Sequence, residues 1–194
     1  FKIKFVDNPC PSRVEDKFNF YKYLDFKIRS NQPIHISSHK PSMKDWGEAS
    51  TTTPFQLKWI PDVHSWIQNS VEMIYWSGQT FVEKGFTLTN FRSHLNSKRI
   101  LPYARVDKNE NILCYAEIVK TQNLGFLNLC RVIVRPDLRG KGLGKTFCKS
   151  LIDQAILMNG YRSIRLNVLE CNQPAISCYQ SPGFKISQRL PHAR

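Results

Sequence analysis

The sequence has no run of 18 consecutive apolar residues, so we expect no membrane-spanning helix. Its first six residues alternate apolar and basic side chains, without the apolar block of a secretory signal. No two of the six cysteines form a C-x-x-C pair, which disfavours a disulfide framework and a structural zinc site. We therefore expect free thiols, no bound metal and a cytoplasmic location.

Acidic residues are scarce, because 15 Asp and Glu stand against 28 Lys and Arg, for a formal net charge of +13. The excess is concentrated in residues 131–194, which hold 11 Lys or Arg and 3 Asp or Glu. A basic surface attracts nucleic acids, anionic lipids and phosphorylated cofactors. Charge alone does not choose among these partners, and a basic surface without a specific partner is also open.

Composition divides the chain into two parts. Residues 1–50 combine an aromatic stretch with a polar, proline-containing one, and they predict an N-terminal extension of unclear role. Residues 51–194 have a regular pattern and predict one domain with its own core. We interpret the Ser/Thr run at 50–53 as irregular structure or linker.

The second part predicts a mixed α/β sheet. A strand is expected over 55–60, a helix from Pro61 to about Ile74, and a short helix over 89–95. Short polar turns separate the next three strands, so these should be antiparallel neighbours. A strand–helix–strand crossover and a second short helix follow before a last strand. The expected ranges from the meander onwards are 100–106, 112–120 and 126–134 (strands), 142–158 (helix), 163–169 (strand), 172–180 (helix) and 183–186 (strand).

A glycine-rich turn joins the strand 126–134 to the helix 142–158. It reads Val134-Arg135-Pro136-Asp137-Leu138-Arg139-Gly140-Lys141-Gly142-Leu143-Gly144-Lys145. Glycine lets the backbone approach a ligand closely, and the amides and dipole of a helix start attract anions. The side chains of Arg139, Lys141 and Lys145 add positive charge around the turn. The segment therefore predicts a pyrophosphate site.

Two other phosphate motifs fail on spacing. The Walker A pattern fits the closing Gly144-Lys145-Thr146, but its first glycine would fall on position 139, which is Arg. The Rossmann pattern needs G-x-G-x-x-G and a parallel βαβ unit, whereas these glycines alternate and follow hairpins.

The turn instead resembles the signature of the GNAT N-acetyltransferase superfamily, [RQ]-x-x-G-x-[GA] after V-x-P. Arg139, Gly142 and Gly144 fill that signature, with Val134 and Pro136 before it. The second cofactor motif of that family matches Asn172-x-x-Ala175-Ile176-x-x-Tyr179-x-x-x-Gly183-Phe184. The resemblance covers about residues 55–190. It implies a GNAT-type fold, with a splayed central strand pair and acetyl-CoA in the gap.

The resemblance also implies the roles of single residues. Backbone groups of Val132, Ile133 and Val134 would pair with the pantetheine arm, and an amide at Val134 or its neighbours would polarise the thioester carbonyl. Asn172 would cap its helix and contact the cofactor. Tyr179 would protonate the departing thiolate, with helix packing as the alternative. The pyrophosphate would lie on the amides of Arg139, Gly140, Lys141, Gly142, Leu143, Gly144 and Lys145.

The sequence does not identify the general base. Family members that acetylate protein N-termini often carry Glu where this sequence has Asn167. Glu117 is our catalytic candidate, acting directly or through water, and Glu170 is a second carboxylate nearby. Glu117 has the alternative of a solvated strand residue. An acceptor amine of low pKa would need no base. The five histidines are assigned to the surface or to packing.

The implied activity is transfer of an acetyl group from acetyl-CoA to an amine of a small molecule or a protein. The alternative is a non-catalytic acyl-CoA-binding or sensor module of the same fold. No nucleic-acid partner is expected, because the phosphate-rich cofactor accounts for much of the charge. We assign the aromatic group of residues 66–86 to core packing, with a substrate groove as the alternative.

The family's sheet has a further strand after Gly183-Phe184, yet only residues 185–194 remain. We take Phe1–Val6 as the candidate for the missing strand, from the same chain or from the partner in a homodimer.

Overall fold

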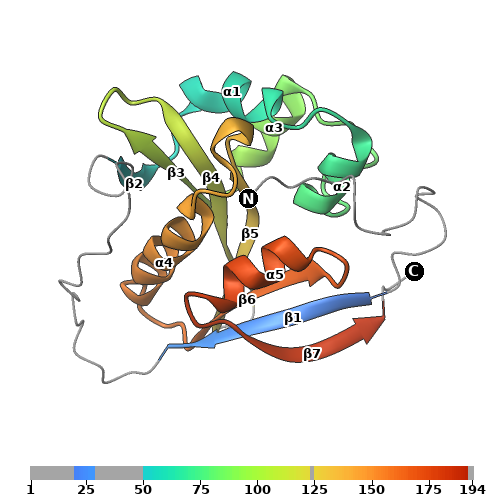
Figure 1. Ribbon diagram of the computed structural model, residues 1–194, viewed down its shortest axis with the longest axis vertical. Coiled ribbons are helices and arrows are strands. Elements are labelled where there is room, and N and C mark those ends of the chain that lie inside the picture. The colour runs from blue at the N-terminus through green and yellow to red at the C-terminus, as the bar shows by residue number, and fades with distance from the viewer. Residues whose placement is uncertain (1–19, 29–49, 123–124, 192–194) are drawn as a thin grey trace.

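The computed structural model describes residues 20–28, 50–122 and 125–191. A seven-stranded mixed sheet organises this part of the chain, in the order β2-β3-β4-β5-β6-β1-β7. Figure 1 shows β1 and β7 at one end of the molecule and α1, α2 and α3 grouped at the other. The strands are β1 (Phe20–Lys27), β2 (Ser50–Pro54), β3 (Ile100–Asp107), β4 (Ile112–Lys120), β5 (Phe126–Val134), β6 (Ser163–Leu169) and β7 (Lys185–Pro191). The helices are η1 (Leu57–Trp59), α1 (Ile60–Ser65), α2 (Ser70–Ser77), α3 (Leu88–Leu95), η2 (Pro136–Leu138), α4 (Leu143–Ile156) and α5 (Gln173–Gln180).

Two hydrophobic clusters cover the two faces of the sheet. Side chains of β4 point to opposite faces. Ala116 and Ile118 belong to the cluster under α4, while Tyr115 belongs to the cluster under α1 and α3. This alternation is the period of two that the sequence shows over these residues. The mixed α/β fold is thus confirmed, with β3, β4 and β5 as antiparallel neighbours.

The prediction of a strand over 55–60 is wrong, and so is the interpretation of 50–53 as irregular structure or linker. Ser50–Pro54 is the edge strand β2, and the next residues turn into η1 and α1. An edge strand pairs on one side only, so it tolerates polar Ser and Thr and ends readily at a proline. The single helix expected from Pro61 is two helices, because Asn69 starts α2 by accepting a hydrogen bond from the Glu72 amide.

The place beside the last strand is taken by β1, which lies between β6 and β7 and pairs antiparallel with both (Figure 1). Leu24 of β1 is fully buried in the core beneath α4. Phe1–Val6, our candidate for this place, lies outside the described ranges. Part of the segment before residue 50 therefore belongs to the sheet, and the division of the chain at residue 50 stays a prediction.

The central strands β5 and β6 are parallel and splay apart, as expected. Within the described ranges their register covers only Phe126–Asn128 of β5 against Ser163–Arg165 of β6. Beyond that point β5 stays paired with β4, and β6 stays paired with β1 along its whole length. Each strand is thus held by its outer neighbour, and this keeps the gap between them open. No helix in the portion described is long and apolar enough to cross a membrane.

Candidate active site

The splay of β5 and β6 opens a cavity of about 400 Å³. Its walls are residues 128–134 of β5, residues 166–169 of β6, the glycine turn, and parts of α2 and α5. Because β5 runs directly into the glycine turn, the turn closes one end of the cavity and the start of the splay forms the other.

The glycine turn is shaped by two residues in the left-handed region. Gly140 has φ of 86° and Gly142 has φ of 81°, a conformation that favours glycine. Gly142 precedes the first residue of α4 and carries no side chain to cap it, so the helix start is left open to a ligand. These two positions fit the pyrophosphate of the implied cofactor.

Gly144 fits the same cofactor for a steric reason. A Cβ atom at this position would lie 3.1 Å from Cys178 Sγ and 3.5 Å from Val134 Cγ2. The first turn of α4 therefore packs closely on α5 and on the end of β5. This close approach brings the amides of the helix start to the cavity wall.

The three basic residues predicted to bind the pyrophosphate, Arg139, Lys141 and Lys145, differ in placement. Arg139 ties the turn down, since its Nε donates to Val134 O at 3.1 Å and its Nη1 lies 3.8 Å from Glu72 Oε1. Lys145 lines the cavity. Lys141 is exposed and lies outside the cavity wall, so it is the one predicted pyrophosphate residue that the structure does not bring there.

Helix α5 brings two predicted residues to the cavity. Asn172 Oδ1 accepts a hydrogen bond from the Ala175 amide and caps the helix, while the residue also lines the cavity. Tyr179 lines it one helix length further on, with its ring 6.3 Å from that of Phe184. Burial raises the pKa of Tyr179 well above its usual range, so the phenol stays protonated and can donate.

Glu117 lies elsewhere. Its side chain is fully buried and does not line the cavity, so the interpretation as a solvated strand residue is wrong. Burial would raise the pKa of Glu117, but hydrogen bonds from His94 and Arg131 and the charge of Arg131 hold it at about 2. A carboxylate held ionised in this way is a weak proton acceptor, and the Arg131 side chain, which lines the cavity, occupies its Oε2.

The other two positions considered for the general base, 167 and 170, place no carboxylate on the cavity wall. Asn167 lines the cavity but is an amide. Glu170 does not line it and lies 3.5 Å from Lys22 Nζ of β1. Among the described residues that line the cavity, the one carboxylate is Glu72, which faces Arg139.

The aromatic group of residues 66–86 packs in the core, as predicted. Trp66 and Phe81 are buried, and Trp76 and Phe86 pack against the same cluster. Tyr75 and Trp76 also line the cavity, and Tyr75 Oη lies 3.3 Å from Cys171 Sγ.

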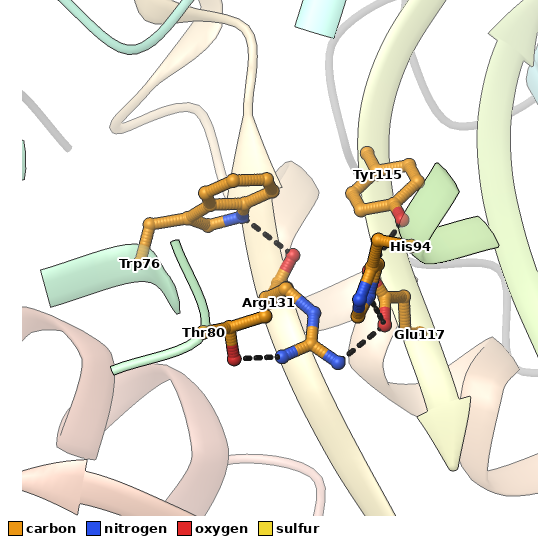
Figure 2. A network of polar contacts seen from close by, with 6 residues as sticks. All are labelled: Trp76, Thr80, His94, Tyr115, Glu117 and Arg131. Carbon is orange, nitrogen blue, oxygen red and sulfur yellow. Dashed lines mark hydrogen bonds and ion pairs between the residues drawn. The ribbon is translucent and has the colours of Figure 1, made fainter. Parts of the chain in front are cut away.

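Sequence reasoning missed a polar network around Arg131. Figure 2 shows the Arg131 guanidinium between Thr80 and Glu117, with Trp76 on the Arg131 carbonyl. His94, which the sequence assigns to the surface or to packing, hydrogen-bonds the same carboxylate. These residues lie far apart in the sequence, so no spacing pattern indicates that they meet. The sequence signal was limited to a glutamate inside an apolar strand.

Known proteins resemble this chain in both sequence and fold. The profile of the Acetyltransferase (GNAT) family matches residues 55–184. The spermidine N-acetyltransferase of Vibrio cholerae, solved with CoA and spermine, superposes with a TM-score of 0.58 at 18% identity, covering 74% of this chain and 90% of that one. The aminoglycoside acetyltransferase AAC(6')-Ib, solved with coenzyme A, gives 0.57 at 18% identity, covering 71% and 84%.

A curated relative matches part of the chain. UPF0157 protein YqkA of Bacillus subtilis (strain 168) is 27% identical over 97 residues, which are 50% of this chain. The match covers 26% of the relative, so it spans about a quarter of that protein's length. The family match includes the glycine turn and the helix with Asn172 and Tyr179, which is the geometry that the cavity displays. This chain belongs to the acetyltransferase (GNAT) family.

Proposed function

We propose that this chain is an N-acetyltransferase that moves an acetyl group from acetyl-CoA to an amine. The observation that carries the proposal is the continuity of one cavity, which runs from the glycine turn along the splayed β5 to Tyr179. Holding donor and acceptor in one site supplies much of the rate of such a transfer. Relatives of the same fold are named for amine substrates, spermidine and aminoglycosides.

Acetyl-CoA would supply the acetyl group as a thioester. The amides of the glycine turn and the start of α4 would bind its pyrophosphate, because two glycines there have left-handed φ and Gly144 lets the helix start pack closely on Cys178 and Val134. Backbone groups of Val132, Ile133 and Val134 would bind the arm that lies along β5, since all three line the cavity. Lys145 would add positive charge at the same end.

Tyr179 would act as the proton donor to the departing thiolate. Tyr179 lines the cavity, and its raised pKa keeps the proton on the phenol oxygen at neutral pH. Asn172 would set the position of Tyr179 by capping α5 and would contact the cofactor. The acceptor amine would lose its proton to water or to a group outside the lining residues, because Glu117 does not reach the cavity.

One observation favours a second function. The one carboxylate among the described lining residues, Glu72, faces Arg139, so the cavity wall offers no unpaired carboxylate as a base. A non-catalytic module that binds acyl-CoA and senses it would show the same feature. Turnover separates the two.

The test combines calorimetric titration of acetyl-CoA with thiol release across a panel of small amines, amino acids and peptides. We expect saturable binding and turnover, and we expect Tyr179→Phe to lower kcat by about a hundredfold, the usual contribution of a general acid. The acetyl-CoA affinity should change little, because the phenol acts mainly in the transition state. Tyr161→Phe is the matched control, since Tyr161 packs on the core outside the cavity wall.

Each other outcome has a clear meaning. Saturable binding without turnover on the whole panel would favour the sensor. Full activity in Tyr179→Phe would remove the proposed acid. Failure to bind acetyl-CoA would contradict both functions.

A further inference from the structure

Strand β5 carries a bulge where it borders the cavity. Glu117 of β4 pairs with Cys130, and Tyr115 pairs with Ile133. Two residues of β5, Arg131 and Val132, therefore face the single residue Ala116. A bulge leaves the extra residue out of the hydrogen-bond ladder and re-aims the groups beside it. The bulge residues line the cavity, next to the positions proposed to bind the cofactor arm.

The bulge depends on an unusual backbone conformation. Arg131 has φ of 53°, in the left-handed region that L residues with a side chain rarely adopt. Glycine would adopt it without strain, but this position is arginine. Such a conformation persists only where surrounding contacts hold it.

Those contacts grip Arg131 at both ends, as Figure 2 shows. Its backbone carbonyl accepts a hydrogen bond from Trp76 Nε1 at 2.8 Å. Its guanidinium donates through Nη2 to Glu117 Oε2 at 2.5 Å and through Nη1 to Thr80 Oγ1 at 3.1 Å. The side chain is 10% exposed and that of Glu117 is 0% exposed, so water competes little for this ion pair.

Glu117 is itself held in place. Tyr115 Oη donates to its Oε1 at 2.6 Å, and His94 Nε2 donates to its Oε2 at 3.0 Å. The carboxylate thus connects β4 with α3, while Arg131 connects β5 with α2 and the segment that follows it. The network fixes the bulge relative to α3 and to α2, and α2 forms part of the cavity wall.

We propose that the buried Glu117–Arg131 pair positions the β5 bulge for acetyl transfer. Both are then positioning residues, and neither transfers a proton in the reaction. This inference rests on the proposed function. It gives a reason for a buried glutamate that does not reach the cavity and for an arginine where the backbone favours glycine.

The test uses the backbone preference of position 131. In a Glu117→Gln background, which avoids a buried unpaired charge, we compare Arg131→Gly with Arg131→Ala. Both double variants lose the same guanidinium, but only glycine holds φ near +53° without strain. If the pair acts through the bulge, the alanine variant should lose at least about tenfold in kcat relative to the glycine variant. The acetyl-CoA dissociation constant and thermal unfolding are measured alongside.

A merely structural role predicts the opposite order. Glycine weakens a strand more than alanine does, so the glycine variant would then be the less stable and no more active. Equal kcat values in the two variants, or a lower value for glycine, would overturn the inference.

A second readout keeps the inference separate from the proposed function. Backbone chemical shifts at residues 130–133 should keep the left-handed signature in the glycine variant and lose it in the alanine variant. If the wild-type chain turns over no acceptor, the proposed function fails, and with it the link from the bulge to catalysis. Retention of the left-handed signature in the alanine variant would show that the pair does not hold the bulge.

Discussion

Replacing Glu117 with Gln should change how stability depends on pH. The pKa of Glu117 is about 2 in the folded chain, below its ordinary 4.5, because His94 and Arg131 outweigh the opposing effect of burial. A carboxyl group whose pKa is lowered by folding stabilises the folded state above its unfolded pKa. That contribution is lost as the pH falls from about 4.5 toward about 2.

The magnitude follows from the two pKa values. The step from 4.5 to about 2 corresponds to about 3 kcal/mol, because one pKa unit is worth about 1.4 kcal/mol. About 2 kcal/mol of this is lost by pH 3, since the unfolded carboxyl is then mostly protonated and the folded one is not. Water screens the interaction little, because the carboxylate is fully buried.

The assay is urea unfolding of wild type and Glu117→Gln at several pH values between 6 and 3. Both proteins share every other titrating group, so the difference between their unfolding free energies isolates residue 117. Wild type should be the more stable at pH 6, and the gap should narrow by about 2 kcal/mol by pH 3. Parallel curves, or a gap that widens as the pH falls, would refute the account of this carboxylate.

Two further predictions concern packing. Gly144→Ala should weaken acetyl-CoA binding by about tenfold in calorimetry, because the new Cβ would lie 3.1 Å from Cys178 Sγ, and adding Cys178→Ala should restore most of the affinity. Overall stability should change little, since alanine favours a helix more than glycine does. If the Gly144→Ala, Cys178→Ala double variant binds acetyl-CoA no better than Gly144→Ala, the contact with Cys178 is not the cause of the weaker binding. Leu24→Ala should lower the free energy of unfolding by about 3 kcal/mol, because Leu24 is fully buried, whereas the exposed Lys27→Ala should stay within about 0.5 kcal/mol. Equal losses in denaturant unfolding would show that β1 contributes no core packing.

Local signals carried much of the fold. The ranges predicted for β4, β5 and β6 match the structure, because alternating side chains and short polar turns act over a few residues. The cap of α5 was also readable, since Asn172 accepts from the amide three residues ahead.

Long-range pairing was not readable in the same way. β1 was missed because its partners, Ser163–Leu169 and Lys185–Pro191, lie more than 130 residues further along the chain. The polar strand β2 was missed because pairing on one side demands little of its side chains.

In the candidate site, too, local features could be predicted and long-range contacts could not. The glycine turn and the Asn172/Tyr179 helix were named because their residues are consecutive or helically spaced, and most of them line the cavity. The surroundings of Glu117 were not readable, because Arg131 comes to lie beside it at a bulge in the neighbouring strand. No local sequence pattern predicts an arginine whose backbone adopts the left-handed conformation.

The most direct test of the central claim is amide hydrogen exchange with and without acetyl-CoA. We expect slower exchange in residues 131–145 and 172–180, which contain the lining residues from the bulge to Tyr179. Unchanged exchange in both segments at saturating acetyl-CoA, or protection confined to other parts of the chain, would contradict it.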